Sequence, residues 1–195
     1  MIQLVPSEQA YSSVAWLLRC EEAAVRAVAH VESGSEGAFL ENQQPVILFE
    51  RHLFRRFTHG KFDDQRFNNE SWGILSDREP GGYGPLTAQH AKLAAAVLLD
   101  RDAALRACSW GLFQILGDNH SACGYPDLQR FINAMYRSAD DHVRAFAMFI
   151  RNDYRLVDAI RNKNWKLFAK VYNGPGNVDA YSKKLREAYY ALNHR

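Results

Sequence analysis

A chain of 195 residues is long enough to bury a core without disulfides or a structural metal, and its content of 47% apolar and 24% charged residues excludes a disordered or fibrous protein. The net charge of +2 is too small, and Lys and Arg are too evenly mixed with acids, to indicate a nucleic acid partner. No apolar run approaches the length of a membrane span, so we expect no stable membrane insertion. Because no repeat, linker or low-complexity segment is visible, residues 1–195 are predicted to form one domain.

The first stretch of the chain predicts two consecutive helices. Ser7 is a typical N-cap residue, and apolar residues at helical spacing follow it to a predicted end near Arg19. The second helix covers residues 21–33, with two glutamates in its first turn, a run of Ala and Val, and Gly34 where a C-terminal cap is expected. This pattern places Glu32 in the last turn of a buried helix.

Residues 38–50 break the helical pattern. Two short runs that favour β-structure, AFLE and VILFE, flank the polar NQQP, and we expect them to pair as one small β-hairpin. Residues 60–85 are rich in Asn, Asp, Gly and Pro with little periodicity, which predicts a long ordered loop. A loop of this length in a compact domain is often functional.

Helical periodicity returns after Thr87. Ser138 with Asp141 three residues later forms a capping-box pattern, and Asn164 and Asn177 are expected to cap the last two helices. The predicted helical segments are AKLAAAVLLD (91–100), AALRACSW (103–110), PDLQRFINAMY (126–136), DDHVRAFAMFIRN (140–152), WKLFAKVY (165–172) and VDAYSKKLREAYYAL (178–192). The sequence therefore predicts a mainly α domain with one small β-hairpin.

Glu32 has the surroundings that an acid catalyst needs. Acid-catalysed cleavage of a glycosidic bond requires a carboxyl group that is still protonated near neutral pH, and an apolar, partly dry site provides one by disfavouring the charged form. Glu32 follows a run of Ala and Val and precedes the small pair Ser33 and Gly34, which leaves room for a sugar. The C-terminal end of a helix also favours the neutral acid. Taken alone, the residue would be read more simply as an exposed glutamate.

Two further segments bring polar residues into apolar surroundings. Residues 108–120, CSWGLFQILGDNH, place Gln114 in an otherwise apolar turn, and residues 169–176, AKVYNGPG, present Tyr172 and Asn173 before a Gly-Pro-Gly turn. Taken separately, the first segment indicates tight helix packing and the second a helix stop.

Together and in this order, the three segments resemble the lysozyme superfamily in its goose-type and lytic transglycosylase branches. The match is closer still to the N-acetylmuramidase family found in endolysins of phages and prophages of Gram-negative bacteria. ILFERHLFRRFTHGKFD (47–63), Gly-Gly-Tyr (81–83), ACSWGLFQILGDNH (107–120) and YNGPG (172–176) all resemble that family's segments. The resemblance covers roughly residues 20–190 and implies a lysozyme-like fold with the β-hairpin beside a catalytic cleft.

The resemblance implies a role for each matching residue. Glu32 matches the family's catalytic glutamate. The expected substrate-binding residues are Ser33, Ser109, Gln114, Tyr172 and Asn173. Glu50 matches a second acidic position, where it would help to activate water or orient the sugar; the alternative is that it pairs with Arg51 or His52 and fixes the hairpin.

The implied function is hydrolysis of the β-1,4 bond between N-acetylmuramic acid and N-acetylglucosamine in bacterial peptidoglycan. Hydrolysis is favoured because the family is described as muramidases and because Glu50 offers a second carboxylate for handling water. Two alternatives stay open: a lytic transglycosylase that gives 1,6-anhydro products, and a catalytically silent module that binds peptidoglycan.

The remaining expectations concern cofactors, redox state and location. Three scattered cysteines without CxxC spacing predict free thiols, and the dispersed histidines match no metal motif, so neither metal nor cofactor is expected. Peptidoglycan glycan strands are the expected partner, and a monomer is expected. Because the N-terminal residues lack the pattern of a signal peptide, we expect the protein to stay in the host bacterial cytoplasm until it is released to the periplasm. No segment is left for a separate wall-binding module, so affinity is expected to come from the cleft and from charge.

Overall fold

The computed structural model describes residues 2–34 and 36–193, and within these ranges the chain forms ten α-helices around a small three-stranded sheet. The helices are α1 (Glu8–Leu18), α2 (Glu22–Ser33), α3 (Arg51–Phe57), α4 (Gln89–Leu99), α5 (Arg101–Arg106), α6 (Leu128–Arg137), α7 (Ala139–Arg151), α8 (Tyr154–Arg161), α9 (Trp165–Tyr172) and α10 (Val178–Asn193). The strands are β1 (Ile47–Phe49), β2 (Cys108–Trp110) and β3 (Ile115–Leu116). The predicted mainly α fold is confirmed.

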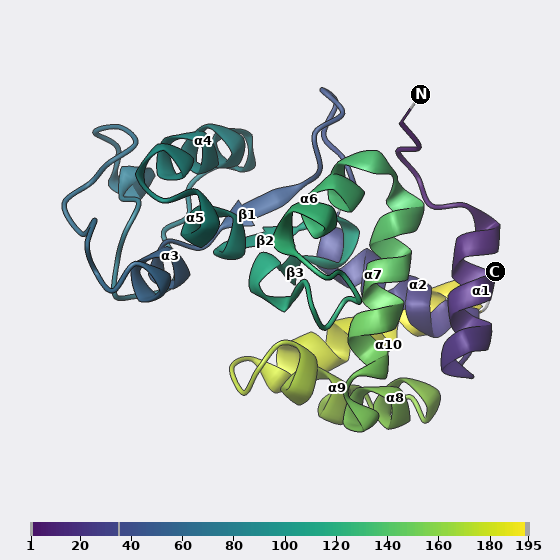
Figure 1. The fold of residues 1–195 in the computed structure, drawn as a ribbon. Helices are drawn as coiled ribbons and strands as arrows, with labels where there is room; N and C mark the ends of the chain where they lie inside the picture. The colour runs from purple at the N-terminus through teal and green to yellow at the C-terminus, as the bar shows by residue number, and fades with distance from the viewer. Residues whose placement is uncertain (1, 35, 194–195) are drawn as a thin grey trace.

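The helices gather at the two ends of the molecule, with the sheet between them. Helices α3, α4 and α5 and the loop after α3 form one end, while α1, α2 and α7 to α10 form the other (Figure 1). Helix α10 packs along α2 and against α9, so the last helix covers the second one. None of the described helices is long and apolar enough to cross a membrane.

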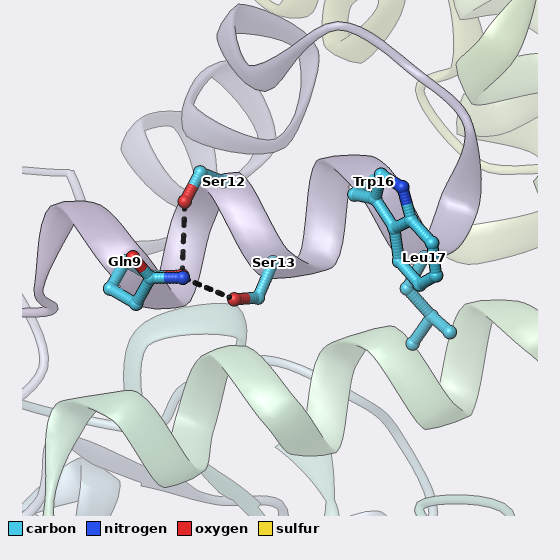
Figure 2. Close-up of a pocket in the computed structure, with 5 residues that line it drawn as sticks. All are labelled: Gln9, Ser12, Ser13, Trp16 and Leu17. Carbon is cyan, nitrogen blue, oxygen red and sulfur yellow. Dashed lines mark hydrogen bonds between the residues drawn. The ribbon is translucent and has the colours of Figure 1, made fainter.

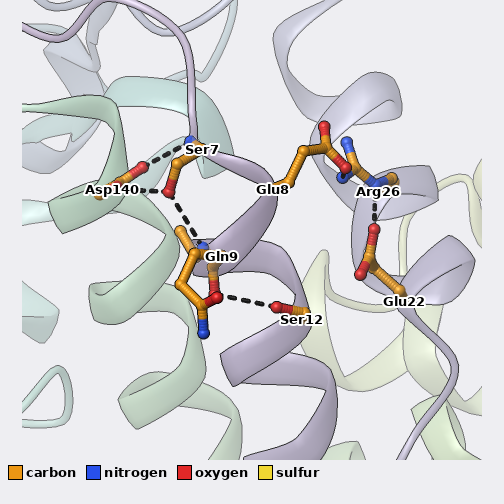
Figure 3. A network of polar contacts seen from close by, with 8 residues as sticks. Ser7, Glu8, Gln9, Ser12, Glu22, Arg26 and Asp140 are labelled. Carbon is orange, nitrogen blue, oxygen red and sulfur yellow. Dashed lines mark hydrogen bonds and ion pairs between the residues drawn. The ribbon is translucent and has the colours of Figure 1, made fainter.

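Helix α1 is held to the larger end by polar contacts at its first turn. Ser7 caps it by accepting a hydrogen bond from the backbone N–H of Ala10, as its sequence position predicts. Ser7 also donates to Asp140 of α7 through its backbone N–H and its hydroxyl, over 2.7 and 2.8 Å. Arg26 of α2 bridges Glu8 and Glu22 (Figure 3).

Another face of α1 is exposed to solvent. Its residues Gln9, Ser12, Ser13, Trp16 and Leu17 line a surface cavity of ≈ 470 Å³, in which the Trp16 side chain is 81% exposed (Figure 2).

The strand pairing differs from the predicted hairpin. Within residues 38–50, the antiparallel contact is one isolated bridge between Phe39 and Pro45, where the backbone N–H of Val46 donates to the carbonyl of Ala38 over 3.0 Å. Strand β1 itself pairs antiparallel with β2, with Ile47 opposite Trp110. The segment 103–110 was predicted as helix, but that helix ends at Arg106. Cys108, Ser109 and Trp110 are all buried, and a short run buried on both faces cannot be assigned to helix or strand by periodicity.

The long loop between residues 60 and 85 is confirmed, and buried polar side chains of α4 fasten its end. The Gln89 amide donates to the backbone carbonyls of Tyr83 and Pro85, over 2.9 and 3.0 Å, and accepts from the backbone N–H of Phe49 in β1. Lys92, fully buried, donates to the same Tyr83 carbonyl over 3.0 Å. These bonds hold the loop against the strand that leads to Glu50.

Candidate active site

Glu32 lies in the last turn of α2, where the sequence places it. The helix ends one residue later because Gly34 adopts a φ of 56°, which a residue with a side chain rarely does, and donates to the carbonyl of His30 over 3.1 Å. The Glu32 side chain is partly buried, and its burial raises the pKa of the carboxyl from 4.5 to about 7. A carboxyl with this pKa is partly protonated at neutral pH.

The hydrogen-bond partner of Glu32 comes from the far end of the chain. The hydroxyl of Tyr181, in the first turn of α10, donates to Oε1 of Glu32. Burial raises the pKa of Tyr181 well above its ordinary value of 10, so the phenol stays protonated and remains a donor. The sequence reasoning did not select Tyr181; its only signal was a tyrosine four residues after Asn177, just beyond the YNGPG motif.

Tyr172, which the family resemblance did select, ends α9 near Glu32. Its hydroxyl donates to the carbonyl of Phe113 over 2.8 Å, and its ring stacks on Phe168 with centroids 5.1 Å apart. Burial first and the charge of Glu32 second raise the pKa of Tyr172 well above its ordinary value. Tyr172 therefore ties α9 to the turn at Phe113 and helps to exclude water from this region.

Gln114 follows that turn in the left-handed conformation, with φ 46° and ψ 44°. Its side-chain amide donates to the carbonyl of Gly111 over 2.8 Å, so the Gln114 nitrogen closes its own turn. Below the turn lies His142 of α7, whose Nδ1 accepts from the backbone N–H of Leu112 over 3.1 Å and whose Nε2 donates to Met135. Burial lowers the pKa of His142 to about 4, so the ring is neutral and supports the turn as an uncharged group.

Glu50 and Ser109 form a second polar pair at the end of the sheet. Glu50 follows β1 and precedes α3, and its Oε1 accepts a hydrogen bond of 2.7 Å from the Ser109 hydroxyl. His52 lies farther away, with Nε2 4.0 Å from Oε2, and Arg51 pairs with Asp77 at 3.4 Å. Of the two partners that the structural alternative gave Glu50, Arg51 does not pair with it, whereas His52 lies at ion-pair distance, 4.0 Å. The nearer partner is Ser109, which was expected to bind substrate.

The last two expected substrate residues differ in how free their side chains are. The Ser33 hydroxyl donates to the carbonyl of Ala29 over 2.8 Å, one turn earlier in α2. Asn173 is the exposed C-cap of α9, where its backbone N–H donates to Ala169 over 3.0 Å. The structure thus groups Glu32, Tyr172 and Tyr181 at the larger end, and Glu50 with Ser109 at the sheet.

A helical, lysozyme-like fold with a partly dry glutamate at a helix end is the arrangement of an enzyme that cleaves peptidoglycan. The chain belongs to the N-acetylmuramidase family, whose model matches residues 21–193. The crystal structure of the Burkholderia AP3 phage endolysin is similar to it, with a TM-score of 0.83 and 35% sequence identity over 98% of this chain and 73% of that chain. A search of the curated proteins gave no significant match. The family resemblance drawn from the sequence is confirmed, and the protein is a peptidoglycan-cleaving enzyme.

Proposed function

We propose that the protein is a muramidase that hydrolyses the β-1,4 bond between N-acetylmuramic acid and N-acetylglucosamine, with Glu32 as the general acid. The observation that carries the proposal is the position of Glu32, whose partly buried carboxyl lies in the last turn of α2 and accepts a hydrogen bond from Tyr181. This burial raises its pKa to about 7. Among the family's motif residues, Glu32 is the carboxyl that combines this partial burial with a phenol donor. The family description and the similarity to a phage endolysin support the choice of substrate.

The reaction begins with the transfer of the Glu32 proton to the glycosidic oxygen. The bond between that oxygen and C1 of N-acetylmuramic acid breaks, which releases the 4-hydroxyl of N-acetylglucosamine and leaves an oxocarbenium-like sugar. The Glu32 carboxylate then accepts a proton from water, and the water oxygen bonds to C1. This second step gives a reducing end and restores the protonated acid.

Glu50 and the other expected site residues have supporting roles in this proposal. Glu50, held by Ser109, contributes a second carboxylate that orients water or sugar. Asn173, exposed directly after Tyr172, contacts the substrate through its side-chain amide, while Gln114 and Tyr172 shape the turn at Gly111–Phe113. Ser33 contributes its backbone, because its hydroxyl is already bonded within α2.

The decisive experiment is lysis of Gram-negative cells with a permeabilised outer membrane, followed by turbidity. Glu32→Gln should fold and lose nearly all activity, because the amide is similar in shape but has no proton to donate. Glu21→Gln is the matched control, since Glu21 also accepts a bond from a tyrosine hydroxyl, that of Tyr189, but at the surface. A folded Glu32→Gln protein with more than a few per cent of wild-type lysis would refute the assignment.

Product analysis separates hydrolysis from its alternatives. Mass spectrometry of digested peptidoglycan should find reducing N-acetylmuramic acid ends. Capture of C1 by the sugar's own C6 hydroxyl would instead give 1,6-anhydro ends, lighter by the mass of a water molecule, and would identify a lytic transglycosylase. Binding to peptidoglycan without any new ends would identify a silent module.

The proposal extends to the protein's setting. We place it in the cytoplasm of a host bacterium until it is released to the periplasm, where it acts on the wall as a monomer. Cytoplasmic expression should then leave cells intact until the inner membrane is permeabilised, and light scattering coupled to size exclusion should give the mass of one chain. Spontaneous lysis would contradict the cytoplasmic location, and the mass of a dimer would contradict the monomeric state.

A further inference from the structure

We propose that Tyr181 is a positioning residue for Glu32, whose hydroxyl orients the carboxyl and stabilises the carboxylate that remains after the proton has moved to the glycosidic oxygen. The proposal rests on the proposed function, since it assigns a task to Tyr181 within the proton transfer by Glu32. None of the segments on which the family resemblance rests contains Tyr181; the hydrogen bond to Glu32 selects it.

The geometry assigns this task to one of the two tyrosines near Glu32. The Tyr172 hydroxyl already donates to the carbonyl of Phe113 over 2.8 Å, and its ring is held by stacking on Phe168. A phenol has a single O–H, so Tyr172 does not donate to Glu32 at the same time. The Tyr181 hydroxyl donates to Oε1 of Glu32.

This hydrogen bond also decides which oxygen of Glu32 carries the proton. Because Oε1 accepts from Tyr181, the proton of the neutral acid sits on Oε2, which is then the atom that faces the glycosidic oxygen. When the proton leaves, negative charge develops on the carboxylate, and a donor already in place becomes a charge-assisted hydrogen bond without rearrangement. Tyr181 therefore stabilises the transition state more than the ground state.

Tyr181 is the hydrogen-bond donor that lowers the pKa of Glu32 at this end of α2. Burial and Tyr181 act on the pKa of Glu32 in opposite directions, burial raising it and the hydrogen bond lowering it. The turn packed against α2, Gly111–Phe113, has no titratable side chain. Of the other titratable groups nearby, Tyr172 of α9 donates to Phe113, Glu8 and Tyr11 of α1 lie beside Arg26, and His30, Lys184 and Glu187 line a separate surface cavity. Helix α10 also carries Asp179, which pairs with Lys166, and Tyr189, which donates to Glu21, together with Lys183, Arg186 and Tyr190.

The test is the pH dependence of wall cleavage by Tyr181→Phe. Without the donor, the pKa of Glu32 should rise, so the alkaline limb of kcat/KM should move upward by about 1 pH unit. At pH 5, where the acid is protonated in both proteins, the variant should be slower by about tenfold, because the developing carboxylate has lost its stabilising bond. Towards pH 8 this deficit should shrink.

Tyr189→Phe is the matched control. Tyr189 lies on the same helix and its hydroxyl also donates to a carboxylate, Glu21, at the surface and away from Glu32. Its removal should leave both the rate and the pH profile unchanged. A Tyr181→Phe deficit that is the same at every pH would show a merely structural role and would overturn the proposal.

A measurement on the wild-type side chain keeps the test independent of how the variant folds. In protein labelled at the phenol carbon of tyrosine, the NMR signal of Tyr181 should shift with an apparent pKa near that of Glu32, and this shift should vanish in Glu32→Gln. A Tyr181 signal that ignores the titration of Glu32 would overturn the proposal. If Glu32→Gln kept its activity, the role of Glu32 as the general acid would be refuted instead. Failure of the role of Tyr181 and failure of the proposed function are therefore distinguishable.

Discussion

The hydroxyl of Ser109 donates a hydrogen bond of 2.7 Å to Oε1 of Glu50, so the middle residue of β2 holds the carboxyl group that follows β1. The pair exists because β1 and β2 are paired, Leu48 opposite Ser109, although the two strands are far apart in sequence. If Glu50 assists the reaction, Ser109 acts through it.

Ser109→Ala should therefore lower kcat/KM by about tenfold, since a hydrogen bond to a charged group contributes about 1.5 kcal/mol. In a Glu50→Gln background the same substitution should add little, because its partner is already gone. The measurement is a double-mutant cycle on purified peptidoglycan, with Ser12→Ala on the outer face of α1 as the control. Strict additivity of the two changes would mean that Ser109 contacts the sugar directly.

Glu32 should make the protein less stable as the pH rises. Its pKa is about 7 in the folded protein, above the ordinary 4.5, so its contribution to stability is fully present below pH 4.5 and is lost as the pH rises through 7. Glu32→Gln has no such loss. Between pH 5 and 8, the free energy of unfolding of Glu32→Gln should rise by about 2 kcal/mol relative to that of the wild type. A shift of one pKa unit corresponds to about 1.4 kcal/mol, and the partial exposure of Glu32 reduces this effect through solvent screening.

Urea unfolding at several pH values measures this difference, and Glu21→Gln is the control. The pKa of Glu21 is lowered, mainly by its bonds to Lys163 and Tyr189, so its contribution is lost only as the pH falls below its ordinary range. The control should therefore be flat between pH 5 and 8. If the difference in free energy of unfolding between Glu32→Gln and the wild type also stayed constant with pH, Glu32 would be ionised throughout this range.

Gly111 should not tolerate a side chain, because a Cβ there would lie 2.5 Å from Nδ1 of the buried His142. Gly124 provides the comparison, since it too has a positive φ, 81° against 67°, but its nearest atom would be 3.5 Å away. We expect Gly124→Ala to lower the free energy of unfolding by about 1 kcal/mol through backbone strain. Gly111→Ala should lower it by at least about 2 kcal/mol more, because of the contact with His142. If urea unfolding gave the same loss of free energy of unfolding for both variants, the His142 side chain would be able to move and make room for the Cβ.

The three cysteines should be unreactive in the folded protein. All are free thiols, and burial raises the pKa of Cys20 to about 11 and that of Cys123 to about 12. A thiol reagent at pH 8 should react slowly with native protein and titrate three groups after denaturation, while reductant should not change the Tm. Recovery of a single thiol in denaturant would reveal a disulfide.

Helix ends were the most predictable part of the fold, because they are decided by neighbouring residues. Ser7, Ser138 and Asn164 all cap the helices that the sequence assigned to them. Helix α8 was not predicted, although Asp153 caps it in the same way.

Contacts between distant segments were the least predictable part. The run VILFE has the composition of a strand but does not specify its partner, and it pairs with residues 108–110, which resemble a helix in sequence. The same limit applies to the site. The local surroundings of Glu32 predicted an apolar, partly dry position, whereas its tyrosine donor lies 149 residues farther along the chain.

That separation has a consequence for the timing of synthesis. Helix α2 leaves the ribosome well before α10, yet the phenol that bonds Glu32 belongs to α10, which packs along α2. Local helices form quickly, but a contact of this range must wait for the intervening chain. We therefore expect a nascent chain halted before α10 to carry Glu32 in an unfinished, wetter environment, so that full lytic activity is acquired only after residue 181 has been translated and α10 has docked.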